Sequence, residues 1–127
     1  MKQSFGGEYP VDWPEIAYRT KQEAHWKCVR CGHDHEPEAG YTLTVHHLDG
    51  NRSNCHWWNT PALCQRCHLS IQGRVIMARP WIFEHSGWFQ PYVAGFYAAV
   101  FLNENLSRGE VMSRLADLLA LQPAVPL

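Results

Sequence analysis

Two short cysteine motifs constrain the fold of this chain more than any other feature. Cys28-Val-Arg-Cys31 and Cys64-Gln-Arg-Cys67 are both C-x2-C pairs. This spacing lets a tight turn present two sulfur atoms to one ion, and two such turns complete a tetrahedral zinc site. We therefore expect one structural zinc at these four cysteines. Because four thiolates leave no open coordination position, this zinc would stabilise the fold and take no part in chemistry.

The surrounding composition favours metal-bound thiolates over disulfides. The N-terminus, MKQSFGGEYPVDWPE, lacks the apolar stretch of a signal peptide, and the nearly apolar run PYVAGFYAAVFL is too short to cross a bilayer. Five cysteines without an export signal fit a reduced compartment, with Cys55 as a spare thiol. At 127 residues the chain is expected to be one cytoplasmic domain, residues 1–127, with no membrane partner.

The charge distribution leaves the partner open. The formal net charge is −1, so the whole chain gives no case for nucleic acid. Between Arg19 and Arg79, however, eight Lys and Arg stand against five Asp and Glu, an excess of three positive charges beside the cysteines. Such an excess is compatible with a polyanion-binding face or with a merely solvated surface.

Local patterns predict a strand, turn, strand and helix between flanking helices. Asp12 and Glu15 form a capping-box pattern that predicts a helix to Trp26. Residues 41–46 alternate in polarity as a half-buried strand does, and the sequence DGN at 49–51 predicts a turn. A second strand is expected over 56–63, at an edge because of Pro61, and a short helix from Cys67 onward.

The C-terminal third is expected to be helical. Helical periodicity covers 92–103, and a capping box at Ser107 and Glu110 begins a second helix whose apolar residues share one face. We interpret this face as core, with a two-fold homodimer through the C-terminal helices as the alternative. The predicted class is α+β, with an N-terminal helix, a hairpin and helix holding the four-cysteine zinc, and a helical extension over about 91–121.

A longer pattern resembles the HNH endonucleases, which belong to the ββα-metal (His-Me finger) nucleases. The matching strings are CVRCG, VHHLDGNRSN and WWNTPALCQRCH, from Cys28 to His68. Asn59 stands twelve residues after His47, and His68 nine residues after Asn59. The resemblance implies a ββα-metal core over about 26–78 in a single HNH nuclease domain that hydrolyses phosphodiester bonds of DNA.

The resemblance also implies a role for each matching residue. His46 and His68 stand where the family places its two ligands to a catalytic divalent metal. His47 stands at the general base that activates water, and Asn59 at the residue that holds the preceding loop in shape. Gln72 occupies a position where some members carry a further histidine, so the metal would have two protein ligands.

The hydrolysis of a phosphodiester requires both a metal ligand and a general base, and one histidine cannot serve as both. Water that attacks a phosphodiester must lose a proton, which an imidazole accepts well near neutral pH. A divalent cation must offset the charge that grows on the phosphate. Successive strand residues point to opposite faces, so His46 and His47 suit different tasks. Two imidazole ligands favour Mn²⁺, Ni²⁺, Co²⁺ or Zn²⁺, although Mg²⁺ held largely by waters and phosphate also fits.

Other functions are weighed against this one. The main alternative is a non-catalytic, zinc-stabilised DNA-binding or scaffold module. A zinc nucleobase deaminase is rejected because no H-x-E occurs and Pro61 is followed by Ala-Leu instead of C-x2-C. A two-Cys, two-His finger is rejected because no H-x3-5-H pair follows at finger spacing. The DNA specificity stays open, and three arginines are equally compatible with phosphate contacts or plain exposure: Arg52, Arg66 and Arg74.

Overall fold

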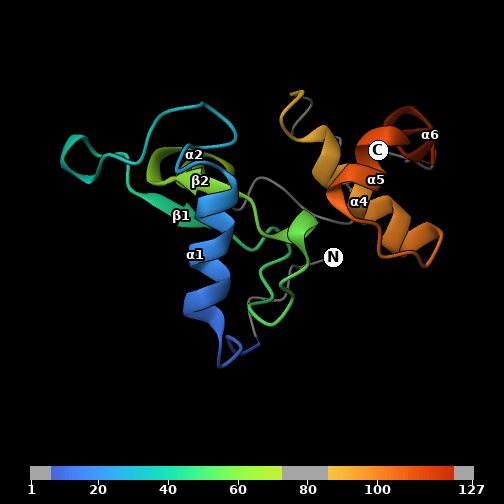
Figure 1. The fold of residues 1–127 in the computed structure, drawn as a ribbon, viewed down its shortest axis with the longest axis horizontal. Helices are drawn as coiled ribbons and strands as arrows, with labels where there is room; N and C mark the ends of the chain where they lie inside the picture. The colour runs from blue at the N-terminus through green and yellow to red at the C-terminus, as the bar shows by residue number, and fades with distance from the viewer. Residues whose placement is uncertain (1–6, 73–85, 122–127) are drawn as a thin grey trace.

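A computed structural model describes residues 7–72 and 86–121 of the chain. It has the expected α+β class: an N-terminal helix, an antiparallel hairpin followed by a helix, and C-terminal helices (Figure 1). The elements in order are α1 (Trp13–Glu23), η1 (Pro37–Ala39), β1 (Leu43–Val45), η2 (Trp57–Asn59), β2 (Ala62–Cys64), α2 (Gln65–Ile71), α4 (Gln90–Phe101), α5 (Arg108–Ser113) and α6 (Leu115–Leu119).

Helix α1 begins where the sequence predicts, but the capping box does not form. Asp12 is the N-cap residue, yet its side chain caps no backbone N–H; its carbonyl accepts from the N–H of Glu15 instead. Pro14 lies in the first turn, where its missing N–H costs nothing. The helix ends at Glu23, three residues before the expected end at Trp26, because His25 and Trp26 adopt positive φ angles.

The hairpin is shorter than its sequence pattern. β1 and β2 pair antiparallel in the register Leu43 with Cys64, Thr44 with Leu63 and Val45 with Ala62. The predicted strand residue Tyr41 makes only an isolated bridge to Glu36. The predicted turn is present, since Gly50 has φ +76° and its N–H donates to the carbonyl of His47.

The expected second strand over 56–63 is wrong in its first half. Residues Trp57–Asn59 form the 3₁₀ turn η2, closed by a bond from the Asn59 N–H to the His56 carbonyl. The hydroxyl of Thr60 donates to the same carbonyl. Pro61 has no N–H for a sheet ladder, so the strand starts only after it.

Helix α2 starts two residues earlier than predicted because a cysteine caps it. Cys64 ends β2 in an extended conformation, and its Sγ accepts from the N–H of Cys67. The helix therefore follows the strand without a loop and carries His68 in its second turn. Its last residue is Ile71.

The C-terminal helices pack as core, with one break that the sequence pattern missed. The capping box at Ser107 and Glu110 is confirmed. The Glu110 N–H donates to the Ser107 hydroxyl at 3.2 Å, and the Ser107 N–H donates to the Glu110 carboxylate at 3.0 Å. The expected single helix is divided into α5 and α6, because Arg114 leaves the helical conformation at φ −123°. Buried faces of α4, α5 and α6 contact one another, and the homodimer stays a prediction.

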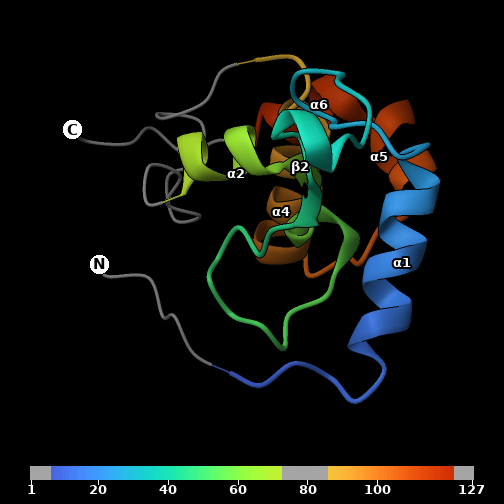
Figure 2. The same ribbon diagram turned by 90° about the vertical axis from the view of Figure 1, so that its left-hand side faces the viewer.

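Two packing relationships place the site. α1 lies against β1, and α4 lies against η2, so η2 joins the hairpin to the C-terminal helices (Figures 1 and 2). Trp58 is buried under α4 with its ring beside Phe96, and the indole N–H of Trp57 donates to the carbonyl of Leu106. Within residues 7–72 and 86–121, no helix is long and apolar enough to cross a membrane.

Candidate functional site

The four cysteines form one cluster, as their spacing predicts. One sulfur from each of Cys28, Cys31, Cys64 and Cys67 lies within 4.8 Å of the others, and all are free thiols. In each pair the second backbone N–H donates to the first sulfur, at 3.5 Å for Cys31 and 3.4 Å for Cys67. The first pair is fastened to the hairpin by a bond from the Val29 N–H to the carbonyl of Ala62. This cluster can hold a metal ion.

The thiol acidities of the cluster bear on how it could hold a cation. Burial alone would raise the pKa of Cys28, but hydrogen bonds from backbone N–H groups bring it down to about 7. Burial raises the pKa of Cys67 to about 12, and burial also raises that of Cys31. The negative charge of the Cys28 thiolate adds a smaller raising effect on the pKa of both. Four thiolates can coexist at this distance only around a positive ion, which stabilises the charged form of each ligand.

His46 and His68 come together from different elements. His46 directly follows β1, where its N–H donates to the carbonyl of Pro61, and His68 lies on α2. Their ring centroids are 4.3 Å apart at an interplanar angle of 49°, so the rings are tilted instead of stacked face to face. Burial, and the neighbouring His68 and His47, lower the pKa of His46 to about 4. At neutral pH His46 is therefore uncharged and retains an unprotonated ring nitrogen that can bind a metal.

Thr44 fixes the orientation and tautomer of His68. The Thr44 hydroxyl donates its only hydrogen to the carbonyl of Leu63 at 2.7 Å. Its second contact, 2.9 Å to Nδ1 of His68, must then be one in which Nδ1–H donates to the hydroxyl oxygen. This assignment leaves Nε2 of His68 unprotonated and available to a metal. A backbone-anchored partner on the other ring nitrogen is typical of metal-binding histidines.

His47 occupies a different environment from its neighbour. Its side chain is only 6% exposed and packs beside Trp13, at a centroid distance of 4.8 Å, and Tyr9, at 5.8 Å. Nε2 of His47 lies 3.8 Å from Sγ of Cys55. Burial lowers the pKa of His47, against the raising effect of Asp49. The imidazole is therefore neutral at pH 7, in the protonation state that a base requires.

Asn59 links the loop after His47 to η2. It is fully buried, and its Oδ1 accepts from the N–H of Asp49 at 3.0 Å. Its Nδ2 donates to the Asp49 carboxylate at 2.9 Å and to the Asn54 carbonyl at 2.8 Å, and its own carbonyl accepts from Leu48. These bonds use both side-chain donors of Asn59 and connect residues 48, 49 and 54 to η2.

Comparisons with known proteins add no assignment of their own. No family model, curated protein or solved structure matches the chain. The function must therefore be argued from the geometry of these residues.

The arginines proposed as phosphate contacts are partly engaged within the protein. Arg66 donates to the carbonyls of Ala39 and Gly40 and lies 4.3 Å over the ring of Tyr41. Arg52 lies 5.4 Å from the centroid of Tyr9, next to the His47 loop. Arg74 lies outside the described residues. Of the two that are described, Arg52 is the one that lies beside the His47 loop.

Three residues near the histidines escaped the sequence interpretation. Thr44 could have been found, because it stands two residues before His46 on the same strand face. Cys55 is a free thiol outside the cluster, as expected, but the sequence does not predict its position beside His47. Trp13 has no local signal, since it reaches His47 only through the packing of α1 against β1.

Proposed function

We propose that this protein is a metal-dependent endonuclease of the HNH type that hydrolyses phosphodiester bonds of DNA. The observation that carries the proposal is the convergence of His46 and His68, with Thr44 leaving Nε2 of His68 unprotonated. If the two histidines served only to stabilise the fold, nothing would require Nε2 of His68 to stay unprotonated. The next residue, His47, is neutral and lies on the opposite face of the strand from His46. It supplies the general base that the reaction needs.

The donor set suits a catalytic cation. Two imidazoles with the rest of the shell open favour Mn²⁺, Ni²⁺, Co²⁺ or Zn²⁺, and Mg²⁺ is compatible if water and phosphate fill most positions. When bound, such an ion supplies positive charge against the scissile phosphate and the leaving oxygen. We further propose that the four-cysteine cluster holds Zn²⁺, because four thiolates are a preferred structural shell for this ion.

The residues would divide the reaction as follows. His46 and His68 hold the cation. His47 accepts the proton of the attacking water at Nδ1, since Nε2 lies beside Cys55. Asn59 keeps the loop, and with it the His47 backbone, in position. Arg52 is placed to contact a neighbouring phosphate.

One observation favours the alternative, a non-catalytic zinc-stabilised DNA-binding or scaffold module. The imidazole of His47 is 6% exposed under Trp13 and Tyr9, whereas a base must meet its water. Under the nuclease proposal, DNA or a small movement of the exposed Tyr9 must open this site. Under the alternative, the ring remains packed and the protein only binds.

Plasmid cleavage separates the two functions. Zinc-loaded protein is mixed with supercoiled DNA and Mg²⁺, Mn²⁺, Ni²⁺ or EDTA, and nicked and linear products are measured. His47→Ala is expected to lose at least about a hundredfold in rate, the usual contribution of a general base. His56→Ala, an exposed histidine nearby, serves as the control and should cut normally. Binding of DNA without cutting under every metal would favour the alternative, as would undiminished cutting by His47→Ala.

A further inference from the structure

A second candidate site lies on the opposite face of the hairpin from His46 and His68. A cavity of about 210 Å³ is enclosed between the end of α1, β2, η2 and the start of α4 and α5. Ala62 lines it, and Ala62 pairs with Val45, so both point to this face. Thr44, which contacts His68, points to the other face of the strand. The lining of the cavity also contains none of His46, His47 and His68, so the cavity is separate from the proposed cutting site.

One wall of the cavity supplies hydrogen-bond donors and a positive charge. Arg108 lies 5.5 Å from the ring centroid of Trp57 and 5.1 Å from that of Tyr92. One of its N–H groups donates to the hydroxyl of Tyr92 at 3.2 Å. Within the described residues its other N–H groups have no partner, and the Tyr92 hydroxyl keeps its own hydrogen to donate. The guanidinium is thus held in place with donors to spare, which suits a carboxylate.

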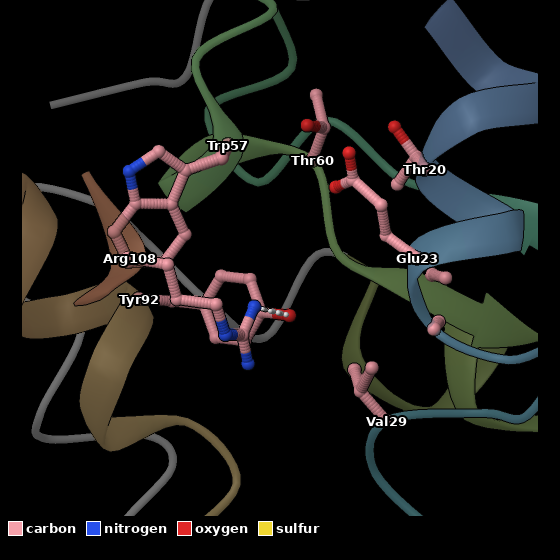
Figure 3. Close-up of a pocket in the computed structure, with 9 residues that line it drawn as sticks. Thr20, Glu23, Val29, Trp57, Thr60, Tyr92 and Arg108 are labelled. Carbon is pink, nitrogen blue, oxygen red and sulfur yellow. Dashed lines mark hydrogen bonds between the residues drawn. The ribbon is translucent and has the colours of Figure 1, made fainter. Parts of the chain in front are cut away.

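The facing wall supplies acceptors and a negative charge. Figure 3 shows Glu23 and Thr20 on α1, with Thr60 beside them, across the cavity from Trp57, Tyr92 and Arg108. The hydroxyls of Thr20 and Thr60 donate to the carbonyls of Ile16 and His56, so each presents only lone pairs to the cavity. In the part of the chain that is described, the Glu23 carboxylate makes no ion pair or hydrogen bond. This wall suits an ammonium group.

The two walls exclude ligands with a single charge. An anion alone would meet Glu23, and a cation alone would meet Arg108, while an apolar ligand would cover both charges without pairing either. The volume equals that of roughly seven liquid water molecules, which suits a small metabolite and is too small for a folded peptide. We propose that this cavity binds a free α-amino acid, with its carboxylate at Arg108 and Tyr92 and its ammonium at Glu23.

The side chain of the ligand would face the small apolar residues at the base of the cavity, Ala24, Val29 and Ala62. This base favours a short aliphatic side chain over a charged one. A bound amino acid would connect α1 to α5. Because ligand that binds only the folded state raises stability in proportion to the logarithm of its concentration, binding should be visible without DNA or a second metal.

Thermal unfolding of the zinc-loaded protein tests the proposal. The standard amino acids are each added to about 10 mM, and hits are titrated by isothermal calorimetry. A short aliphatic amino acid is expected to bind, whereas its N-acetyl derivative and its amide, each lacking one charge, should bind at least about tenfold more weakly. If no amino acid binds, the proposal is wrong. It is also wrong if the amino acid, its N-acetyl derivative and its amide bind equally well.

Variants locate the site. Glu23→Gln and Arg108→Gln should each weaken binding by roughly tenfold or more, and Arg108→Lys should recover only part of the loss, because a lysine lacks the planar fork. Glu15→Gln, on the same helix but away from the cavity, is the matched control. Unchanged binding by both cavity variants, with circular dichroism confirming the fold, would contradict the assignment. The outcome is independent of whether the protein cuts DNA.

Discussion

Thr44 and His68 share a hydrogen bond of 2.9 Å in which the imidazole donates, because the threonine hydroxyl has already donated its hydrogen to the carbonyl of Leu63. Thr44→Val removes this acceptor and leaves the His68 tautomer unfixed. Losing such an outer partner typically costs about 10–100-fold in metal affinity or activity. The expected result is a higher Mn²⁺ concentration for half-maximal plasmid cleavage.

Thr44→Ser should retain the wild-type metal dependence, since it keeps the hydroxyl. Thr42→Val is the control on the same strand face, because the hydrogen bonds of Thr42 to Gln65 run through its backbone. If Thr44→Val needs no more metal than Thr42→Val, the hydrogen bond does not tune the site. Calorimetric titration of Mn²⁺ measures the same affinity without cleavage.

Removal of one cluster cysteine should abolish metal binding there and unfold much of the chain. Cys64→Ser loses a ligand and replaces the sulfur that caps α2. Elemental analysis should find one zinc per chain in the wild type and less in the variant, whose circular dichroism should lose helix signal. Cys55→Ser lies outside the cluster and should keep its zinc. A fully folded, zinc-free Cys64→Ser would show that the cluster does not stabilise the fold through metal.

Asn59→Ala should destabilise the protein by about 3 kcal/mol, because it leaves the Asp49 N–H and the Asn54 carbonyl without their side-chain partner and removes one hydrogen bond to the Asp49 carboxylate. Urea unfolding of the zinc-loaded protein measures this change. Asn105→Ala, at an exposed position, is the matched substitution and should change the free energy of unfolding by less than about 0.5 kcal/mol. Equal stability of the two variants would contradict the role given to Asn59.

Two glycine-to-alanine changes in the C-terminal helices should have opposite effects. At Gly95 on α4 an added Cβ would lie 2.8 Å from Cβ of Trp58 and 3.1 Å from Cζ2 of Trp57, so overpacking should cost about 1–3 kcal/mol. At Gly109 on α5 nothing lies within 4 Å of the added atom, and the higher helix propensity of alanine should stabilise by up to about 1 kcal/mol. Thermal unfolding of both variants checks the signs, and a stable Gly95→Ala would show that α4 does not press on η2 this closely.

Stability should fall with acid through His46. Its pKa is about 4 in the folded protein against an ordinary 6.5, so the unfolded chain binds the proton first as the pH falls. The stabilisation is complete above about pH 6.5 and is lost toward pH 4, by at most about 3 kcal/mol. Urea unfolding should therefore show a shallower pH dependence over this range in His46→Gln than in the wild type. His25→Gln, at an exposed position, is the control and should keep the full slope.

The sequence predicts those features whose signal is local or periodic. The paired cysteine motifs anticipate the cluster, the capping box anticipates the start of α5, and polarity alternation anticipates β1. The convergence of His46 and His68 is expected only through the family resemblance, because the antiparallel register places His46 beside Pro61, at the other end of β2 from the start of α2. The hairpin and helix order could thus be predicted without knowledge of long-range packing.

Features decided by tertiary contact could not be predicted in this way. The segment before Pro61 is expected to be part of a strand but forms η2, because Trp58 is buried under α4 and Asn59 turns inward to Asp49. The aromatic cover on His47 depends on how α1 lies across the hairpin. The break between α5 and α6 at Arg114 could not be predicted, because no proline or glycine lies there.

Cys64 has three structural roles. It is the last residue of β2, its Sγ accepts the capping hydrogen bond of α2, and it belongs to the four-cysteine cluster. Its sulfur also lies 3.8 Å from that of Cys31. An oxidant that joined these two sulfurs would remove two thiols from the cluster and alter the cap of α2 in a single reaction. His68, one turn further along that helix, would then lose the support that orients it. The protein is therefore expected to be sensitive to peroxide at a residue outside the histidine pair.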